Sequence, residues 1–303
     1  MTPSHPARPR RSVLYVPGSN ARALEKAATL PADGLILDLE DAVLPAAKLA
    51  ARAAVLAAVA GRRFGHREVV IRINGLATEW GPADLEAAAT SGVDGILLSK
   101  VDGVGTLLKA ADVLARSAAP TSLQLWSMAE TPRGVLDIDA IARCTPRLGV
   151  IVMGTADLGK ALRVPEQPGR AALIPALAHC VLAARAASVD ILDGVYTHLT
   201  DASGFRAECA QGKHLGFDGK TLIHPGQLDA CNEIFGVSSD EAASAAELIA
   251  AWESAAAGGA GVAVLAGRLV ERLHVLEAQR QLALYRAIQH RTIQAQTLQT
   301  RPA

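Results

Sequence analysis

The stretch GLILDL, residues 34–39, is a short apolar run without polar alternation, and it is one of eight such runs along the chain. Continuous apolar residues indicate strands buried on both faces, as in a parallel sheet covered by helices. An alanine- and leucine-rich stretch with helical periodicity separates each run from the next. The eight predicted strands begin at Ser12, Gly34, Val69, Gly95, Ser122, Leu148, Ile191 and Lys220.

The spacing of these runs predicts repeated βα units. The runs lie roughly 20 to 40 residues apart, which accommodates a strand, a crossover helix and two loops. A doubly wound open sheet is the alternative, but no GxGxxG follows the first run, and polar residues follow many runs instead of one. We therefore predict an α/β fold with a closed (β/α)₈ TIM barrel.

The pattern changes after the eighth run, which predicts a second region. Residues 11–227 are expected to form the catalytic barrel and residues 228–290 a small helical C-terminal appendage or lid. The appendage helices break at Gly258 and Gly259, and the last one ends near Gln289. Residues 1–10 and 291–303 are expected to be mobile tails because they are polar or proline-containing without periodicity.

The composition argues against several classes of function. Hydrophobic residues make up 50% of the 303 residues and charged residues 20%, which indicates a globular chain. Thirty basic residues balance thirty acidic ones without a long basic run, so we expect neither a nucleic acid nor a membrane as a partner. The four cysteines form no CxxC pair, and no secretory signal pattern is visible. We expect a cytoplasmic protein that binds a small molecule.

The carboxyl ends of barrel strands converge on one mouth, where the active site of such a fold lies. This rule selects the polar residues at the end of each predicted strand or just after it. They are Ser19, Asn20, Asp38, Glu40, Asp41, Arg72, Asn74, Lys100, Glu130, Asp157 and His224. For Lys100 and His224 we favour a structural role.

Glu130 and Asp157 follow the fifth and sixth strands and are candidates to hold one Mg²⁺ ion. Magnesium commonly takes one or two protein carboxylates and keeps its other positions for water and substrate. Capping of the following helices is an equally good interpretation of both residues from position alone.

Arg72 lies within VIRIN, where a guanidinium is unfavourable unless its side chain faces the solvated barrel mouth and acidic groups there. Its planar fork matches a substrate carboxylate. An ion pair with Asp38 or Glu40 is the alternative, and the two roles are compatible. After the first strand, a turn into a helix brings Arg22 and Lys26 close to free backbone amides, which is a weak signal for phosphate binding.

Taken in order, seven motifs resemble the HpcH/HpaI aldolase/citrate lyase family, in its citrate lyase β-subunit and malyl-CoA lyase branch. They are RSVLYVPGSN, DGLILDLEDAV, VIRIN, SMAET, MGTADL, DGVYTHLTDASGF and LGFDGKTLIHPGQ, and the match runs from about Arg11 to about Arg286.

The resemblance implies an oxo-acid lyase that cleaves or forms a 3-hydroxy-acyl-CoA thioester, giving an acetyl thioester and a 2-oxo acid. It implies Mg²⁺ held by Glu130 and Asp157, with Glu130 and Arg72 at the substrate and Asp38 and Glu40 in the catalytic machinery. It also implies CoA entering over the first loop, near Arg22 and Lys26.

One element departs from the family pattern. Relatives that cleave malyl- or citramalyl-CoA often carry an aspartate in a GKMVD-like element, presented to a neighbouring subunit. Here the element reads GRLVE from Gly267, and the matching acid, expected to serve as the catalytic general acid or base, is Glu271, one methylene longer. A shift of about an ångström in reach can cost on the order of a hundredfold in rate.

Three hypotheses remain open at this level. The first is a stand-alone, trimer-like homo-oligomeric lyase acting on malyl- or citramalyl-CoA. The second is the β subunit of a citrate lyase complex, partnered by an acyl-carrier protein and acting on a citryl thioester. The third, which the departure at Glu271 suggests, is a barrel that binds a metal and an oxo acid without turnover.

Overall fold

A computed structural model describes residues 8–165 and 168–299. The chain divides into two compact units, Arg10–Phe235 and a second that combines residues 1–9 with residues 236–303.

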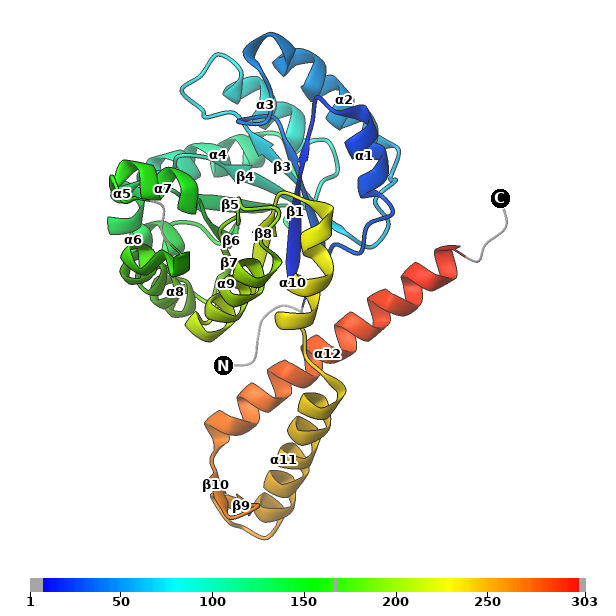
Figure 1. Cartoon of the computed structure of the whole chain (residues 1–303), viewed down its shortest axis with the longest axis vertical. Helices are drawn as coiled ribbons and strands as arrows, with labels where there is room; N and C mark the ends of the chain where they lie inside the picture. Colours follow the sequence, from blue (N-terminus) through cyan, green and yellow to red (C-terminus); the bar gives the residue numbers. More distant parts are fainter. Residues whose placement is uncertain (1–7, 166–167, 300–303) are drawn as a thin grey trace. The chain divides into compact units, whose positions relative to one another are not determined.

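The first unit contains a closed barrel of eight parallel strands in sequential order (Figure 1). This confirms the predicted fold. All eight predicted runs contribute a strand, and most boundaries agree within two residues. The strands are β1 (Ser12–Pro17), β2 (Gly34–Asp38), β3 (Glu68–Ile73), β4 (Gly95–Leu98), β5 (Gln124–Ala129), β6 (Leu148–Met153), β7 (Asp190–Asp193) and β8 (Gly219–Leu222).

Helices surround the barrel and connect its strands. They are α1 (Ala21–Ala27), α2 (Lys48–Ala60), α3 (Gly81–Ala89), α4 (Val104–Arg116), α5 (Pro132–Leu136), α6 (Ile138–Arg143), α7 (Thr155–Ala161), α8 (Ile174–Ala187), α9 (Ala202–Leu215) and α10 (Leu228–Ile234), with short 3₁₀ turns at Pro45–Ala47, Pro168–Leu173 and Pro225–Gln227. The predicted barrel boundary at residue 227 falls before α10. The compact unit includes α10 because Leu228, Cys231 and Phe235 belong to its core.

Successive residues of each strand face two separate apolar layers. The outer layer joins strand residues such as Leu35 and Ile71 to helix residues such as Val55 and Leu107. The inner layer fills the barrel with Val13, Ile36, Val70, Leu97, Trp126, Met128, Val150, Val152 and Leu192. The barrel is therefore a packed core, and polar groups inside it gather at its two ends.

A charged cluster closes the amino-terminal end of the barrel. The Arg10 guanidinium donates to Glu68 at 2.7 Å, to Asp190 at 2.5 Å and to Gln124 at 2.9 Å. These three partners are the first residues of β3, β7 and β5, so they form one layer drawn from alternate strands. Arg10, expected to lie in a mobile tail, is instead buried in this floor.

The segment Gly169–Ala187 is long and apolar enough to cross a membrane by length and composition. In the structure its helical part, α8, buries Leu177, Cys180 and Ala184 in the barrel unit. Burial accounts for part of its apolar character, since Leu182 of the same helix is exposed.

The second unit is built from α11 (Ser239–Ala257), a hairpin of β9 (Ala263–Leu265) and β10 (Arg268–Val270), and α12 (Arg272–Gln299). Buried Ala263, Val270 and Val275 pack against partly buried residues of α11. The expected end of the appendage at residue 290 falls within α12, which continues through residues 291–299 of the predicted tail. Residues 1–7 and 300–303 lie outside the described residues.

A second buried charge cluster lies in the wall of the barrel. Asp193 accepts hydrogen bonds from Lys220 at 2.9 Å and from both terminal nitrogens of Arg170, at 2.5 and 2.9 Å. Burial opposes ionisation of Asp193, but the two cations outweigh it and lower its pKa. Lys220 also bonds Glu208 at 2.8 Å, which balances the charges.

The lowered pKa of Asp193 predicts a pH-dependent contribution to stability. The contribution is complete above the unfolded pKa of about 3.9 and is lost as pH falls through the lower folded value. We expect Asp193→Asn to reduce the free energy of unfolding by about 3–5 kcal/mol at pH 7. The difference from wild type should shrink below about pH 4, measured by urea denaturation. The exposed control Asp139→Asn should change stability by less than about 1 kcal/mol, and a pH-independent difference at position 193 would contradict the assignment.

Candidate active site

Arg72 and Asp38 form the central ion pair of the barrel mouth. They are direct partners in the register of β2 and β3. The guanidinium donates from Nε to Asp38 Oδ1 at 2.7 Å and from Nη2 to Oδ2 at 2.5 Å, and both side chains are buried. Burial opposes the charge of Arg72, but the bonds and charge of Asp38 hold its pKa above the usual value. The ion pair considered from sequence is therefore present, and it uses the fork of Arg72.

The remaining nitrogen of Arg72, Nη1, faces the acidic turn after β2. It lies 2.9 Å from Glu40 Oε2 and 3.2 Å from Asp41 Oδ2, while Lys100 Nζ lies 3.6 Å from Glu40 Oε1. Burial raises the pKa of Glu40, against the lowering effect of Arg72. Among the described residues, Glu40 Oε2 has no hydrogen-bond partner, because its approach to Arg72 has ion-pair distance without hydrogen-bond geometry. Glu40 is thus a carboxylate suited to accept a proton.

Glu130 directly follows β5 and is buried in the mouth. The backbone N–H of Lys100 donates to Glu130 Oε1 at 2.6 Å. A Cβ on Gly154, which follows β6, would lie 2.4 Å from Glu130 Cβ and 2.9 Å from Oε2. The glycine therefore leaves room for this side chain, whose Oε2 faces the end of β6. Burial and the charges of Glu40 and Asp157 raise the pKa of Glu130 to about 7.

Asp157 lies in the first turn of α7 and is half-buried. Its charge acts on both Glu130 and Lys100. The helix-capping alternative finds no support: Thr131 caps α5 at 3.0 Å, and none of the described side chains caps α7.

The two carboxylates suit a magnesium ion. One oxygen of Glu130 is bound by an amide and the other lies beside Gly154, three residues before Asp157, whose charge acts on Glu130. Both carboxylates supply the hard oxygen atoms that Mg²⁺ prefers. Among the described residues, no three His, Cys, Asp or Glu side chains form a metal-binding group. An ion here would have two protein ligands and open positions.

Tyr15 is a mouth residue that the strand-end rule does not select. Its ring lies beneath Arg72, with the guanidinium carbon 4.9 Å from the ring centroid. Burial raises its pKa, so the phenol stays neutral. Its inward position on β1, two residues after Val13, is the signal that would have identified it.

The other predicted residues lie elsewhere or have structural partners. Asn74 bonds Asp84, and His224 caps the turn at Pro225–Gln227. Arg22 and Lys26 are both exposed on α1. Glu271 is exposed at the start of α12, in the second unit, and its backbone N–H donates to His274.

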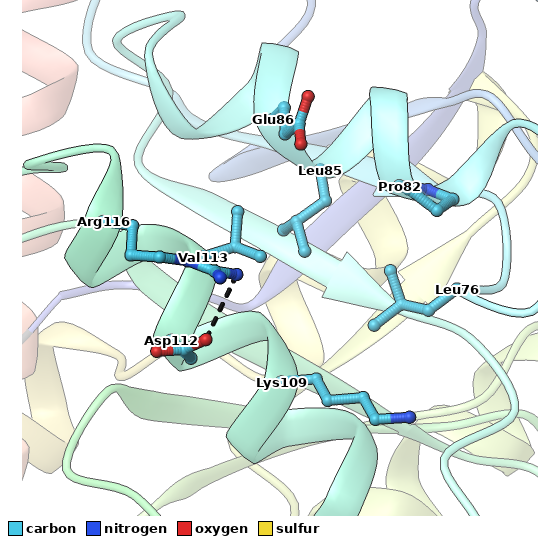
Figure 2. A pocket seen from close by; sticks show the side chains of 8 residues that line it. All are labelled: Leu76, Pro82, Leu85, Glu86, Lys109, Asp112, Val113 and Arg116. Carbon is cyan, nitrogen blue, oxygen red and sulfur yellow. Dashed lines mark ion pairs between the residues drawn. The ribbon is translucent and has the colours of Figure 1, made fainter.

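A cavity of about 240 Å³ lies between α3 and α4, on the outside of the barrel (Figure 2). Its lining contains none of the predicted site residues. The residues that line it are Leu76, Pro82, Leu85, Glu86, Lys109, Asp112, Val113 and Arg116.

The profile of the HpcH/HpaI aldolase/citrate lyase family matches residues 11–225, which contain all eight barrel strands and the mouth residues described above. The chain belongs to this family of enzymes. The resemblance drawn from the seven motifs is therefore confirmed.

Relatives of this HpcH/HpaI family protein include a (3S)-malyl-CoA thioesterase of Cereibacter sphaeroides, 48% identical over 94% of this chain and 98% of the relative. Citrate lyase subunit beta of Escherichia coli (strain K12) is 35% identical over 87% and 89%.

Solved structures are similar as well. The protein CitE of Mycobacterium tuberculosis, in complex with magnesium, acetoacetate and coenzyme A, matches with a TM-score of 0.73 at 27% identity, covering 90% of this chain and 97% of that one. A citrate lyase of Burkholderia xenovorans LB400 matches with a TM-score of 0.81 at 17% identity, covering 98% and 99%, and shows the shared fold.

Substitution of Gly154 tests the placement of Glu130. We expect Gly154→Ala to weaken Mg²⁺ binding by roughly 10- to 100-fold, because the new methyl group displaces a ligand, and Glu130→Ala to abolish it. Isothermal titration with Mg²⁺ measures both. The control Gly159→Ala, on α7, places its methyl group in open space and should bind like wild type. Unchanged affinity in Gly154→Ala would contradict the placement.

The fork between Arg72 and Asp38 predicts that lysine cannot replace Arg72. An ammonium cannot bond both carboxylate oxygens and also face Glu40. We expect Arg72→Lys to lower kcat/KM by about a hundredfold with Mg²⁺ affinity within twofold of wild type, since Glu130 and Asp157 follow other strands. Steady-state kinetics and Mg²⁺ titration decide this, and full activity in the variant would remove Arg72 from the site.

Proposed function

We propose that the protein is a Mg²⁺-dependent enzyme that hydrolyses the thioester of a 3-hydroxy-acyl-CoA of the malyl type. The observation that carries this proposal is the 48% identity to a (3S)-malyl-CoA thioesterase over nearly the whole of both chains. The choice of hydrolysis revises the sequence-based expectation of a lyase, which rested on family motifs common to both reactions.

The mouth has the groups that this reaction requires. A Mg²⁺ ion held by Glu130 and Asp157 would polarise the thioester carbonyl and stabilise the oxyanion. Arg72 Nη1 donates to Asp41 at 3.2 Å, and it is the nitrogen that binds a substrate carboxylate in place of Asp41, because Asp38 occupies the other two donors. Glu40, with a raised pKa and an oxygen without a hydrogen bond, removes a proton from the attacking water. The water oxygen forms a bond to the carbonyl carbon, the carbon–sulfur bond then breaks, and the proton that Glu40 took from the water passes to the CoA sulfur.

Carbon–carbon cleavage is the second candidate reaction. It is favoured by a 28% identical relative, citrate lyase beta subunit of M. tuberculosis, solved with oxaloacetate and magnesium (TM-score 0.63, 76% of this chain and 97% of that one). In this reaction a carboxylate, Glu40 or the Glu271 of a neighbouring subunit, takes the hydroxyl proton as the bond to the acyl α-carbon breaks, and the α-carbon of the resulting enolate then takes up a proton. A homo-oligomer is proposed as the working form. An acyl-carrier protein would be a partner only if the chain is the β subunit of a citrate lyase complex.

Product analysis separates the two reactions. We expect the purified chain with Mg²⁺ and malyl-CoA to release free CoA thiol and malate, without acetyl-CoA or glyoxylate. A thiol reagent detects CoA, and mass spectrometry detects the acids. The matched control is the Glu130→Ala variant, which should release neither. Acetyl-CoA with glyoxylate would establish the lyase reaction instead, and wild-type protein inactive on malyl-, citramalyl- and citryl-CoA would refute both proposals.

A further inference from the structure

Lys48, the first residue of α2, is a buried lysine whose ammonium binds backbone carbonyls. Its side chain is 7% exposed, and it donates to the carbonyl of Leu39 at 2.9 Å and to that of Glu40 at 2.7 Å. Burial lowers its pKa, against the raising effect of nearby carboxylates. In the described part of the chain no carboxylate pairs with it. Burying an ammonium costs free energy unless it is hydrogen-bonded, so these two bonds offset that cost and tie Lys48 to two successive carbonyls of the turn.

The turn is held from both sides. The Asp38 carboxylate accepts the backbone N–H groups of Glu40 at 2.8 Å and of Ala42 at 3.2 Å. Lys48 binds the carbonyls of the same turn. Glu40 lies between these two sets of bonds, and its side chain reaches Arg72 and Lys100 in the mouth.

Arg52, one turn later on α2, fixes the end of the neighbouring strand β3. It donates to Asp84 at 2.5 Å and to the Trp80 carbonyl at 3.2 Å. Asp84 in turn accepts the backbone and side-chain N–H groups of Asn74, at 3.1 and 2.6 Å.

The two cations also meet at Trp80. The ring of Trp80 lies 5.6 Å from Lys48 Nζ, and its carbonyl accepts from Arg52. Residues of α2 thus bind the turn after β2 directly, through Lys48, and reach the end of β3 indirectly, through Arg52 and Asp84.

We propose that Lys48 is a positioning residue that holds the turn Asp38–Asp41 so that Glu40 faces Arg72 in the barrel mouth. Its role in catalysis rests on the proposed function, whereas its role in ordering the turn does not. Lys48 acts through Glu40 and does not touch the substrate. Glu130 and Asp157 follow β5 and β6, outside the turn that Lys48 binds.

The test uses three variants of the full chain. Lys48→Met removes the charge, Lys48→Arg keeps a cation that can donate to carbonyls, and Lys109→Met is the matched control at an exposed lysine of α4. Three measurements are made on each: amide hydrogen exchange of residues 38–44, Mg²⁺ affinity, and kcat and KM with the thioester that wild type turns over.

We expect Lys48→Met to speed exchange in residues 38–44 at least about tenfold relative to the strands β5 and β6. Its kcat/KM should fall by about a hundredfold, mostly in kcat, while Mg²⁺ affinity stays within twofold. Lys48→Arg should recover at least a tenth of wild-type kcat/KM, and Lys109→Met should match wild type throughout.

Other outcomes separate the claims. The proposal would be overturned if amide exchange and kcat/KM were both unchanged in Lys48→Met. It would also be overturned if exchange became faster throughout the barrel and Mg²⁺ binding became weaker, because that result would mark a purely structural role. If wild type turns over no thioester, the proposed function fails, and the exchange of residues 38–44 alone decides whether Lys48 orders the turn.

Discussion

The paired hydrogen bonds between Arg72 and Asp38 are the constraint on which the mouth of the barrel depends. The two residues are opposite each other on adjacent strands, so the parallel register brings a guanidinium and a carboxylate together in a buried site. Removing one partner of such a pair costs about 3–5 kcal/mol, because the other charge is left without compensation. The bonds also fix the orientation of both groups: Asp38 caps the acidic turn, and Arg72 presents its third nitrogen to Glu40 and Asp41.

The fold was predictable from sequence because its strands are short, apolar and buried on both faces. The run at Gly34 matches β2, and the run at Gly95 matches β4. The largest error in a strand's first residue concerns β5, which begins at Gln124 and not at Ser122, and the largest error in a last residue concerns β7, which ends at Asp193 although the apolar run continues to Tyr196. The strand-end rule selected Asp38, Glu40, Arg72 and Glu130 without structural knowledge, and these residues do contact one another or a shared neighbour, Lys100. What Arg72 and Glu130 bind remains part of the proposal.

Other features had no readable signal in the sequence. Lys48 begins an alanine-rich helix, where a lysine is normally solvated, and only the fold shows that it is buried. The β9–β10 hairpin was missed because its two-residue turn, Ala266-Gly267, lacks the Asn or Asp that usually marks such turns, although both residues have positive φ, 49° and 76°. Arg10 was assigned to a tail because the residues around it are polar or proline and show no periodicity. Its partners Glu68 and Asp190 are 58 and 180 residues away in sequence, so no local pattern indicates that it is buried.

The charged floor made by Arg10, Glu68, Gln124 and Asp190 closes one end of the barrel to small molecules. Above it lies a tightly filled apolar interior, so the described barrel residues leave no solvent channel between the two ends. Every molecule that takes part in the reaction enters and leaves through the same opening. In the proposed hydrolysis, water and thioester would share this one passage, and the depth to which the acyl chain fills it would set how many water molecules remain beside the reactive carbonyl.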